Sequence, residues 1–211
     1  MKLSVKSIRP TKIVCVGLNY IEHARELKLR IPKDPVIFLK PPSSVIYDRD
    51  DIVYPPRVKR LDFEAELAII VKKKTRNIKP KDAPSHILGF TCLNDVTARD
   101  LQEKDGQWTR SKSFDTFCPI GPVIETDLDP SDIKIESYLN GVLRQSSSSA
   151  NLIFSVSELV AYVSGVMTLL PGDIISTGTP PGVGPMRPRD IIEVRIEGIG
   201  ALKNKVVAAG K

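Results

Sequence analysis

Short runs of β-branched and other apolar residues recur along the whole chain, and this pattern constrains its fold more than any other feature. Runs of this length, bounded by turn residues, are typical of strands buried on one or both faces. They cover residues 12–16, 36–39, 63–71, 87–93, 133–139, 173–177 and 191–196. Because helical segments do not alternate regularly with these runs, a doubly wound sheet and a barrel of eight βα units are disfavoured. The sequence therefore predicts an α+β, β-rich fold.

Turn residues predict two hairpins. Asn140-Gly141 separates ESYL from VLRQ, and a type I′ turn needs positive φ at both central residues, which Asn and Gly tolerate. The glycine-containing stretch 198–200 indicates a second hairpin farther along the chain.

Few segments have helical character. Helices are expected over residues 21–29, over a short segment that starts near Asp95, and over residues 155–165. The last begins with Ser155 and Glu158, which have the spacing of a capping box.

Length, composition and charge limit the class of protein. The 211 residues, 41% of them hydrophobic, are enough for one full core, so we expect a single domain over 1–211, with a short N-terminal strand region over about 1–12 and the core from about 13. The net charge of +6 is scattered, and aromatic residues at 6% are too sparse for a stacking strip. A small anionic substrate fits this charge, and nucleic acid is a weaker alternative that we do not expect.

Cysteine usage and hydropathy indicate an intracellular protein. Cys15, Cys92 and Cys118 are far apart, and none has the CxxC spacing of a structural zinc site. They are expected to be reduced core thiols. The first residues lack the apolar stretch of a signal peptide, and no segment approaches the ~20 apolar residues that span a bilayer. We therefore expect a cytoplasmic protein without a membrane partner.

The segment DFEAELAII carries the first group of candidate ligands. A strand would place Asp62, Glu64 and Glu66 on one face, because side chains alternate along a strand. Like charges in one row repel unless a cation neutralises them. The alternative is an edge strand with a solvated acidic face.

Asp95 is the second acidic candidate, at the end of an apolar run in LNDVTARD. As the N-cap of a helix it would need no other role. A turn from strand to helix is also a common place for a ligand. Three carboxylates without a nearby Cys or His ligand suit a hard ion, Mg²⁺ or Mn²⁺.

His23 and Glu26 share one face of the expected helix IEHARELK. A carboxylate beside an imidazole orients the ring and raises its basicity, which a general base that activates water requires. An ordinary surface pair is the alternative.

Two further segments could contact an anionic substrate. WTRSKSFDTFCPIGP contains Arg110 and Lys112, either of which could pair with a substrate carboxylate. STGTPPGVGP offers hydroxyls and backbone amides in a glycine-rich loop. It lacks the spacing of a nucleotide site, and such loops are usually only turns.

Five motifs occur in the order found in the fumarylacetoacetate hydrolase family, and the chain resembles its short, single-domain branch. The motifs are VGLNYIEHARE, DFEAELAIIV, GFTCLNDVTARD, WTRSKSFDTFCPIGP and STGTPPGVGP. The branch includes acylpyruvate hydrolases, oxaloacetate decarboxylases and 2-hydroxyhepta-2,4-diene-1,7-dioate isomerases. The resemblance implies a mixed β-roll, a homodimer and a Mg²⁺ or Mn²⁺ site.

The resemblance also assigns roles to individual residues. The implied metal ligands are Glu64, Glu66 and Asp95, and the implied base with its orienting partner is His23 with Glu26. Lys112 matches the catalytic lysine of the family. The matched positions near the substrate are Gln102 and Thr179, to which we add Arg110 as a further candidate. Leu18 departs from the pattern, because many relatives have arginine there, which puts inherited specificity in doubt.

The expected function is metal-dependent chemistry on a small 2-oxo acid. A metal that polarises the 2-oxo group stabilises an enolate, and the paired His23 and Glu26 favour hydrolysis of a carbon-carbon bond in an acylpyruvate-type substrate. Decarboxylation of oxaloacetate or isomerisation of a diene-dioate is the alternative. A catalytically silent binding module would have lost a ligand or the His23–Glu26 pair, and neither is missing.

Overall fold

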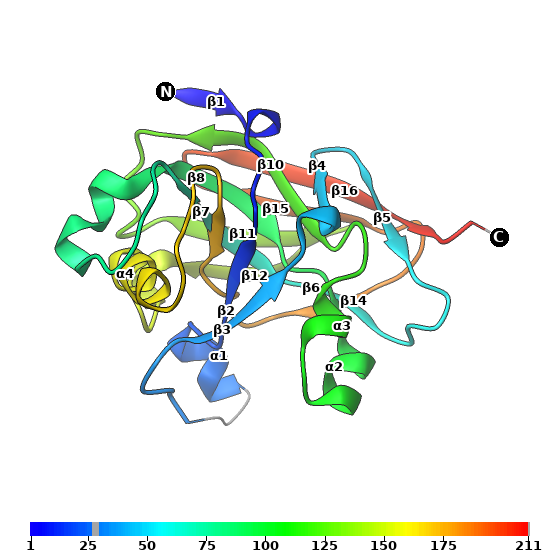
Figure 1. Ribbon diagram of the computed structural model, residues 1–211. Helices are drawn as coiled ribbons and strands as arrows, with labels where there is room; N and C mark the ends of the chain where they lie inside the picture. The colour runs from blue at the N-terminus through cyan, green and yellow to red at the C-terminus, as the bar shows by residue number, and fades with distance from the viewer. Residues whose placement is uncertain (27–29, 211) are drawn as a thin grey trace.

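Two β-sheets packed against each other form most of the computed structural model, which describes residues 1–26 and 30–210 (Figure 1). The larger sheet has the strand order β1-β10-β8-β7-β13-β2-β3, and β4 lies parallel beside β10. Its strands are β1 Lys2–Ser4, β2 Ile13–Gly17, β3 Val36–Lys40, β4 Val45–Tyr47, β7 Ala65–Val71, β8 Ile87–Asn94, β10 Cys118–Glu125 and β13 Ile174–Ser176.

The second sheet has the order β12-β11-β15-β16-β5, and a small third sheet has the order β14-β6-β9. The five strands of the second sheet are β5 Asp51–Tyr54, β11 Lys134–Leu139, β12 Val142–Ser148, β15 Ile191–Ile196 and β16 Gly200–Ala208. The third sheet contains β6 Leu61–Phe63, β9 Thr97–Ala98 and β14 Gly184–Met186. The β-rich α+β class is confirmed.

Strand β7 shows why the two sheets pack as they do. Every residue of AELAIIV is buried. Leu67 and Ile69 belong to the core that also contains strand residues of the second sheet and one face of α4, whereas Ala68 and Ile70 belong to a separate cluster on the other side. A continuous apolar run is the expected sequence of a strand that is covered on both faces.

The α-helices of the described residues are α1 Ile21–Glu26, α2 Arg99–Asp105, α3 Thr109–Lys112 and α4 Val156–Val166; short 3₁₀ turns lie at Val5–Ser7, Pro42–Ser44, Pro80–His86 and Ser149–Asn151. The expected capping box of α4 is confirmed. The helix expected over 21–29 is present to Glu26, and residues 27–29 lie outside the described part. The helix expected to start near Asp95 begins only at Arg99. Of the described helices, none is long and apolar enough to cross a membrane.

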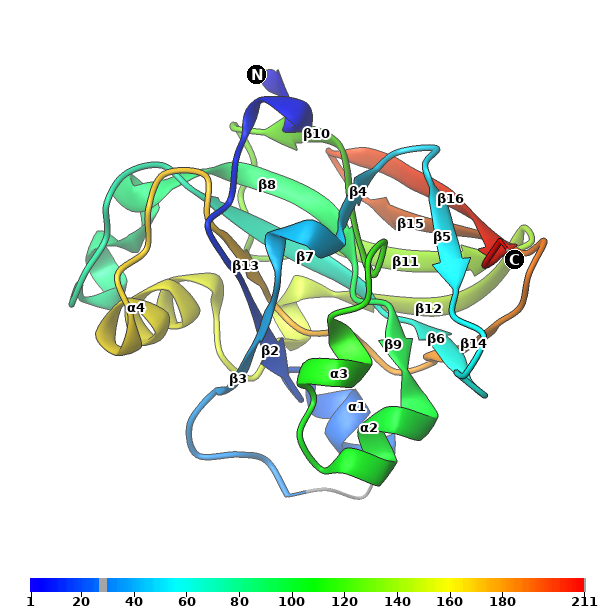
Figure 2. The same ribbon diagram turned by 45° about the vertical axis from the view of Figure 1, so that its right-hand side comes forward.

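Both expected hairpins are present. Asn140 and Gly141 have φ of 53° and 80° between β11 and β12, as a type I′ turn requires. Gly198, with φ of 78°, lies in the turn between β15 and β16. Figure 2 shows α1, α2 and α3 gathered at one end of the large sheet, near β2 and β3. This end carries the candidate site.

Candidate metal and substrate site

The pairing of β7 with β8 brings the acidic residues together. Ala65 lies opposite Asn94 in this antiparallel pair. The Glu64 amide donates to Asn94 Oδ1 at 3.0 Å, and the Asp95 amide donates to the Glu64 carbonyl at 2.9 Å. At Glu64 the chain passes from the small sheet into the large one, so both strand ends deliver carboxylates to the same place.

Glu64, Glu66 and Asp95 form a buried cluster in which one oxygen of each lies within 4.8 Å of the others. All three residues are less than a tenth exposed, so the alternative of an edge strand with a solvated acidic face is wrong. Asp95 is not a helix cap either, since the N-cap of α2 is Ala98. Three hard oxygen ligands with no Cys or His among them suit Mg²⁺ or Mn²⁺.

Asp62 does not join this cluster, although it precedes Glu64 by two residues. Its carboxylate is bound by the guanidinium groups of Arg60 and Arg99, at 2.9 Å from each Nε. Arg99 also donates to Glu64 Oε1 through Nη2. The Arg99 guanidinium therefore binds Asp62 and Glu64 at the same time and neutralises part of the negative charge of the cluster.

Two buried lysines contact the cluster directly. Lys112 Nζ lies 2.9 Å from Glu64 Oε2 and 2.6 Å from Asp95 Oδ2. Lys40 Nζ lies 2.5 Å from Asp95 Oδ1 and 3.1 Å from the Val96 carbonyl. A buried ammonium without a partner would be very costly. Both lysines are therefore held at this place by the carboxylates.

The carboxylates have opposite pKa shifts. Burial favours the neutral form of Glu64, but the nearby Lys112 and Arg99 outweigh it and lower its pKa to about 2. For Glu66, burial and repulsion from Asp95 and Glu64 raise the pKa to about 8. The Glu66 carboxylate accepts hydrogen bonds from the Ser176 hydroxyl and, at 2.9 Å, from the Gly178 amide. A bound dication would favour its ionised form.

The cluster opens into a cavity of about 170 Å³. His23 lines this cavity, and its Nδ1 lies 2.9 Å from Glu26 Oε2. His23 is only 8% exposed, whereas the Glu26 side chain is nearly half exposed, so the pair joins a buried ring to a carboxylate in contact with solvent. Thr179 also lines the cavity; its hydroxyl donates to the Ala65 carbonyl and accepts from Gln145 Nε2 at 2.7 Å.

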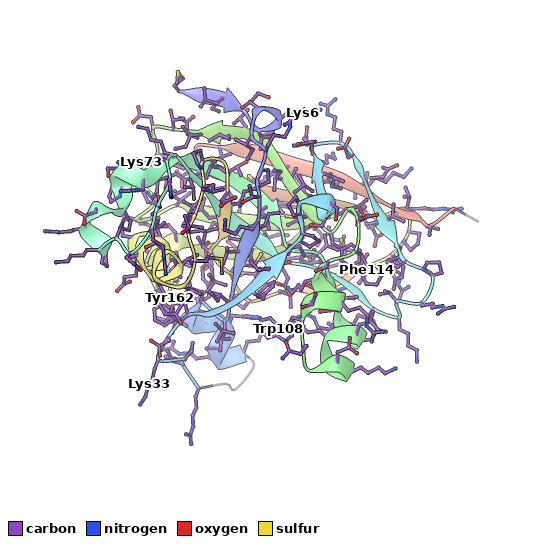
Figure 3. All side chains as sticks on the ribbon, viewed as in Figure 1. Lys6, Lys33, Lys73, Trp108, Phe114 and Tyr162 are labelled. Atoms are coloured by element: carbon purple, nitrogen blue, oxygen red, sulfur yellow. The ribbon has the colours of Figure 1, made fainter. Side chains whose placement is uncertain are left out.

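Apolar side chains complete the lining of the cavity. Leu18, Phe38 and Trp108 contribute to it, and Trp108 packs edge-on against Phe38 with ring centroids 5.1 Å apart. Gly17 makes this packing possible, because a Cβ there would lie 2.7 Å from the indole ring. Figure 3 labels Trp108 between α1 and the α2–α3 pair.

Comparison with known proteins identifies the family. The profile described as "Fumarylacetoacetate (FAA) hydrolase C-terminal" matches residues 12–207. The chain belongs to the fumarylacetoacetate hydrolase family. It is 44% identical to oxaloacetate tautomerase Fahd2a, mitochondrial, of Rattus norvegicus, over 94% of this chain and 67% of the relative.

Two solved structures of the family superpose closely. The 5-carboxymethyl-2-hydroxymuconate delta-isomerase of Mycobacterium smegmatis has a TM-score of 0.91 at 48% identity, covering 97% of this chain and 81% of that one. The fumarylpyruvate hydrolase of Pseudomonas aeruginosa, in complex with Mn²⁺ and pyruvate, has a TM-score of 0.92 at 31% identity, covering 99% and 96%. The relatives named here are enzymes.

The fold gathers most of the residues that the family resemblance singled out. The cavity lining includes His23, Glu64, Glu66, Asp95, Gln102, Lys112 and Thr179, and Glu26 reaches it through His23. Arg110, which we had added to these residues because of its place in the motif, does not line the cavity, and that expectation is corrected. It is exposed and forms a bidentate pair with Asp105, away from this cavity. Its neighbour two residues on, Lys112, points inward, since α3 places the two side chains on different faces.

Sequence reasoning missed several residues of this site. Lys40 follows the apolar run of β3, where a single charged residue at a strand end gives no sign of burial. Arg99 lies within DVTARD but was not singled out, and neither Phe38 nor Trp108 was considered as part of a site. The one available signal for Lys40 was its position directly after an apolar run.

Proposed function

We propose that this chain is a divalent-metal-dependent enzyme that acts on small 2-oxo acids. The observation that carries this proposal is a buried group of three carboxylates opening into the same small cavity as the His23–Glu26 pair. Perturbed carboxylates beside a histidine in a cavity are typical of active sites.

The donor set fits Mg²⁺ or Mn²⁺. Glu64, Glu66 and Asp95 would hold the ion through carboxylate oxygens, and Lys112 already places a positive charge between two of them. When bound, the ion would polarise the 2-oxo group and stabilise negative charge on its oxygen. The related fumarylpyruvate hydrolase, which was solved with Mn²⁺ and pyruvate, supports this assignment.

Lys112 and Arg99 would supply positive charge at the cavity wall. Although burial favours the neutral amine, Asp95 and Glu64 raise the pKa of Lys112. Lys112 therefore stays protonated at neutral pH. It is suited to binding a substrate oxygen and not to accepting a proton.

His23 is the residue best placed to move a proton. With Glu26 on Nδ1, its other ring nitrogen is available as a base. For carbon-carbon bond hydrolysis of an acylpyruvate-type substrate, our first candidate reaction, His23 would take a proton from the attacking water. Keto–enol tautomerisation of oxaloacetate is the second candidate, favoured by the 44% identity to an enzyme of that name. There His23 would move a proton at the carbon beside the 2-oxo group.

Decarboxylation of oxaloacetate and isomerisation of a diene-dioate are further reactions of the same substrate class. Turnover of acylpyruvates, oxaloacetate and diene-dioates should therefore be screened with Mg²⁺ and Mn²⁺. Loss of CO₂ needs an electron sink and no attacking water. Removal of the base should therefore slow the other reactions more than decarboxylation.

The His23→Ala variant tests the assignment of the base. Hydrolysis or tautomerisation should fall by ~10²- to 10⁴-fold, the usual contribution of a positioned base, while any decarboxylation survives largely intact. The measurement is the rate of each reaction at saturating metal. His86→Ala is the matched control, because His86 contacts Thr75 and lies outside the cavity lining. Equal loss of hydrolysis and decarboxylation, with metal affinity preserved, would contradict a role for His23 as the base.

A further inference from the structure

Lys40 is a buried cation that the proposed reaction does not yet use. It is the last residue of β3, and its side chain is fully buried. Its ammonium has two contacts among the described residues, Asp95 Oδ1 and the Val96 carbonyl. A lysine held this far from water must have a partner that stays ionised.

Lys40 and Lys112 bind opposite oxygens of Asp95. Lys112 binds Oδ2, bridges to Glu64 and lines the cavity. Lys40 binds Oδ1 and is not part of the cavity lining. A ligand that enters the cavity can therefore take over contacts of Lys112, whereas Lys40 stays behind Asp95 and keeps its carboxylate in place.

The charges of the cluster explain why a second lysine is useful. Ion pairs connect three carboxylates, Asp62, Glu64 and Asp95, with four cations, Lys40, Arg60, Arg99 and Lys112, and an ionised Glu66 beside them would complete the balance of charge. With the carboxylates ionised, a dication would leave the site with two positive charges. The part of a 2-oxo acid enolate that would face the metal carries two negative charges, one on the adjacent carboxylate and one on the enolate oxygen.

We propose that Lys40 is a positioning residue that fixes Asp95 from behind and supplies the positive charge that matches the metal-loaded site to a dianion. This inference rests on the proposed function and specifies the charge of the species that the site binds best. Oxalate is a suitable probe because it is a planar dianion with the two-oxygen geometry of such an enolate. Pyruvate is the corresponding monoanion.

Lys40→Met tests the proposal by removing the charge while keeping most of the side-chain volume. Mn²⁺ binding to metal-stripped protein is measured by calorimetry, and oxalate and pyruvate are then titrated into Mn²⁺-loaded protein. Fluorescence of Trp108, the one tryptophan of the chain, follows ligand binding in the cavity. Because Coulomb energy scales with ligand charge, we expect oxalate affinity to fall ~10-fold or more and pyruvate affinity by only about threefold.

Mn²⁺ affinity should stay within about threefold, because losing a nearby positive charge favours a cation and offsets the looser Asp95 carboxylate. Lys12→Met is the matched control, since Lys12 forms a similar pair with the buried Asp173 outside the cavity. It should leave all three affinities unchanged. In Lys40→Gln, a shorter neutral donor, oxalate affinity should fall as in Lys40→Met.

Unchanged oxalate affinity in Lys40→Met, or equal losses for oxalate and pyruvate, would overturn the charge-matching role. A parallel loss of Mn²⁺ and oxalate affinity, or failure of both Lys40 variants to fold while Lys12→Met folds, would reduce Lys40 to a scaffold residue. If the wild-type protein bound no Mn²⁺, or bound Mn²⁺ but no oxalate, the proposed function itself would fall, and this inference with it.

Discussion

Glu66 has a pKa of about 8 because it is buried beside Asp95 and Glu64. Below that pH the metal-free protein holds a proton on this carboxylate, and a metal must displace it before it can bind. Mn²⁺ affinity should therefore rise with pH up to about 8. Glu64, with its pKa of about 2, is already ionised throughout this range and adds no such dependence.

Proton release measures this linkage directly. Calorimetric titration of Mn²⁺ in buffers of different ionisation enthalpy should show about one more proton released per chain at pH 6.5 than at pH 9.5, since Glu66 is protonated only at the lower pH. In Glu66→Ala the pH difference should vanish, and Mn²⁺ affinity should fall by more than the ~10- to 100-fold typical of an outer-shell partner. Asp173→Asn, which changes a buried carboxylate elsewhere, serves as the control. Equal proton release at both pH values would refute the linkage to Glu66.

At the scale of the elements, the end of β2 and the segment between α2 and α3 meet at a glycine. A Cβ on Gly17 would lie 2.7 and 2.8 Å from two carbons of the Trp108 ring, too close to keep the present packing. Gly17→Ala should destabilise the fold by about 1–3 kcal/mol, as overpacking does, and should alter Trp108 fluorescence and weaken oxalate binding.

Gly165 provides the opposite case in α4. It is exposed, and a Cβ there would meet no atom within 4 Å. Gly165→Ala should raise the free energy of unfolding by about 0.5–1 kcal/mol without changing fluorescence. Denaturant titration of both variants and the wild type measures these changes in the free energy of unfolding. Equal stability of Gly17→Ala and wild type, with unchanged fluorescence, would show that the indole has more room than its packing indicates.

The strands differ in how readily the sequence reveals them. Long apolar runs such as those of β7 and β8 were predicted because periodicity accumulates over many residues. Strands of two to four residues, such as β4, β5 and β9, were missed since so few residues carry no period. Strand β10 was missed although it has eight residues, because the prolines and glycine in CPIGPVIE are more typical of a loop. The continuous run 63–71 also concealed the break at Glu64, where pairing changes from one sheet to another.

For the whole molecule, exposed apolar side chains at one end of the second sheet fit the homodimer that the family resemblance implies. Val142 and Leu143 on β12 and Ile191 at the start of β15 are each more than a third exposed. They lie at one end of the second sheet, because Val142 and Ile192 both pair with Leu139, although Val142 is on the opposite face from Leu143 and Ile191. Clusters of this kind commonly mark protein interfaces.

We predict that the purified protein is a dimer of the 23.3 kDa chain, as measured by light scattering. Val142→Lys should shift the equilibrium toward monomer by placing a charge in the interface. Val166→Lys, which alters a similarly exposed valine on α4, should not. A monomer mass for the wild-type protein at working concentration would count against the dimer.

Local patterns in the sequence predicted the β-rich class, the two hairpins, the capping box of α4 and the candidate ligands Glu64 and Glu66. Each of these depends on neighbours within a few residues, whose relative positions local geometry fixes. The sequence also offered Asp95, His23 and Lys112 as candidates, and the family resemblance assigned their roles. It could not show that Glu64 and Asp95 are joined through the register of β7 on β8.

The charges that surround the cluster are set by contacts between distant segments of the chain. Lys40 reaches Asp95 across 55 residues of sequence, and Arg99 bridges Asp62 and Glu64 from a separate helix. Arg110 and Lys112, two residues apart, differ because α3 turns one outward and the other inward. Contacts between distant segments depend on strand register and helix orientation, which are set by packing of the whole core and leave no local pattern in the chain.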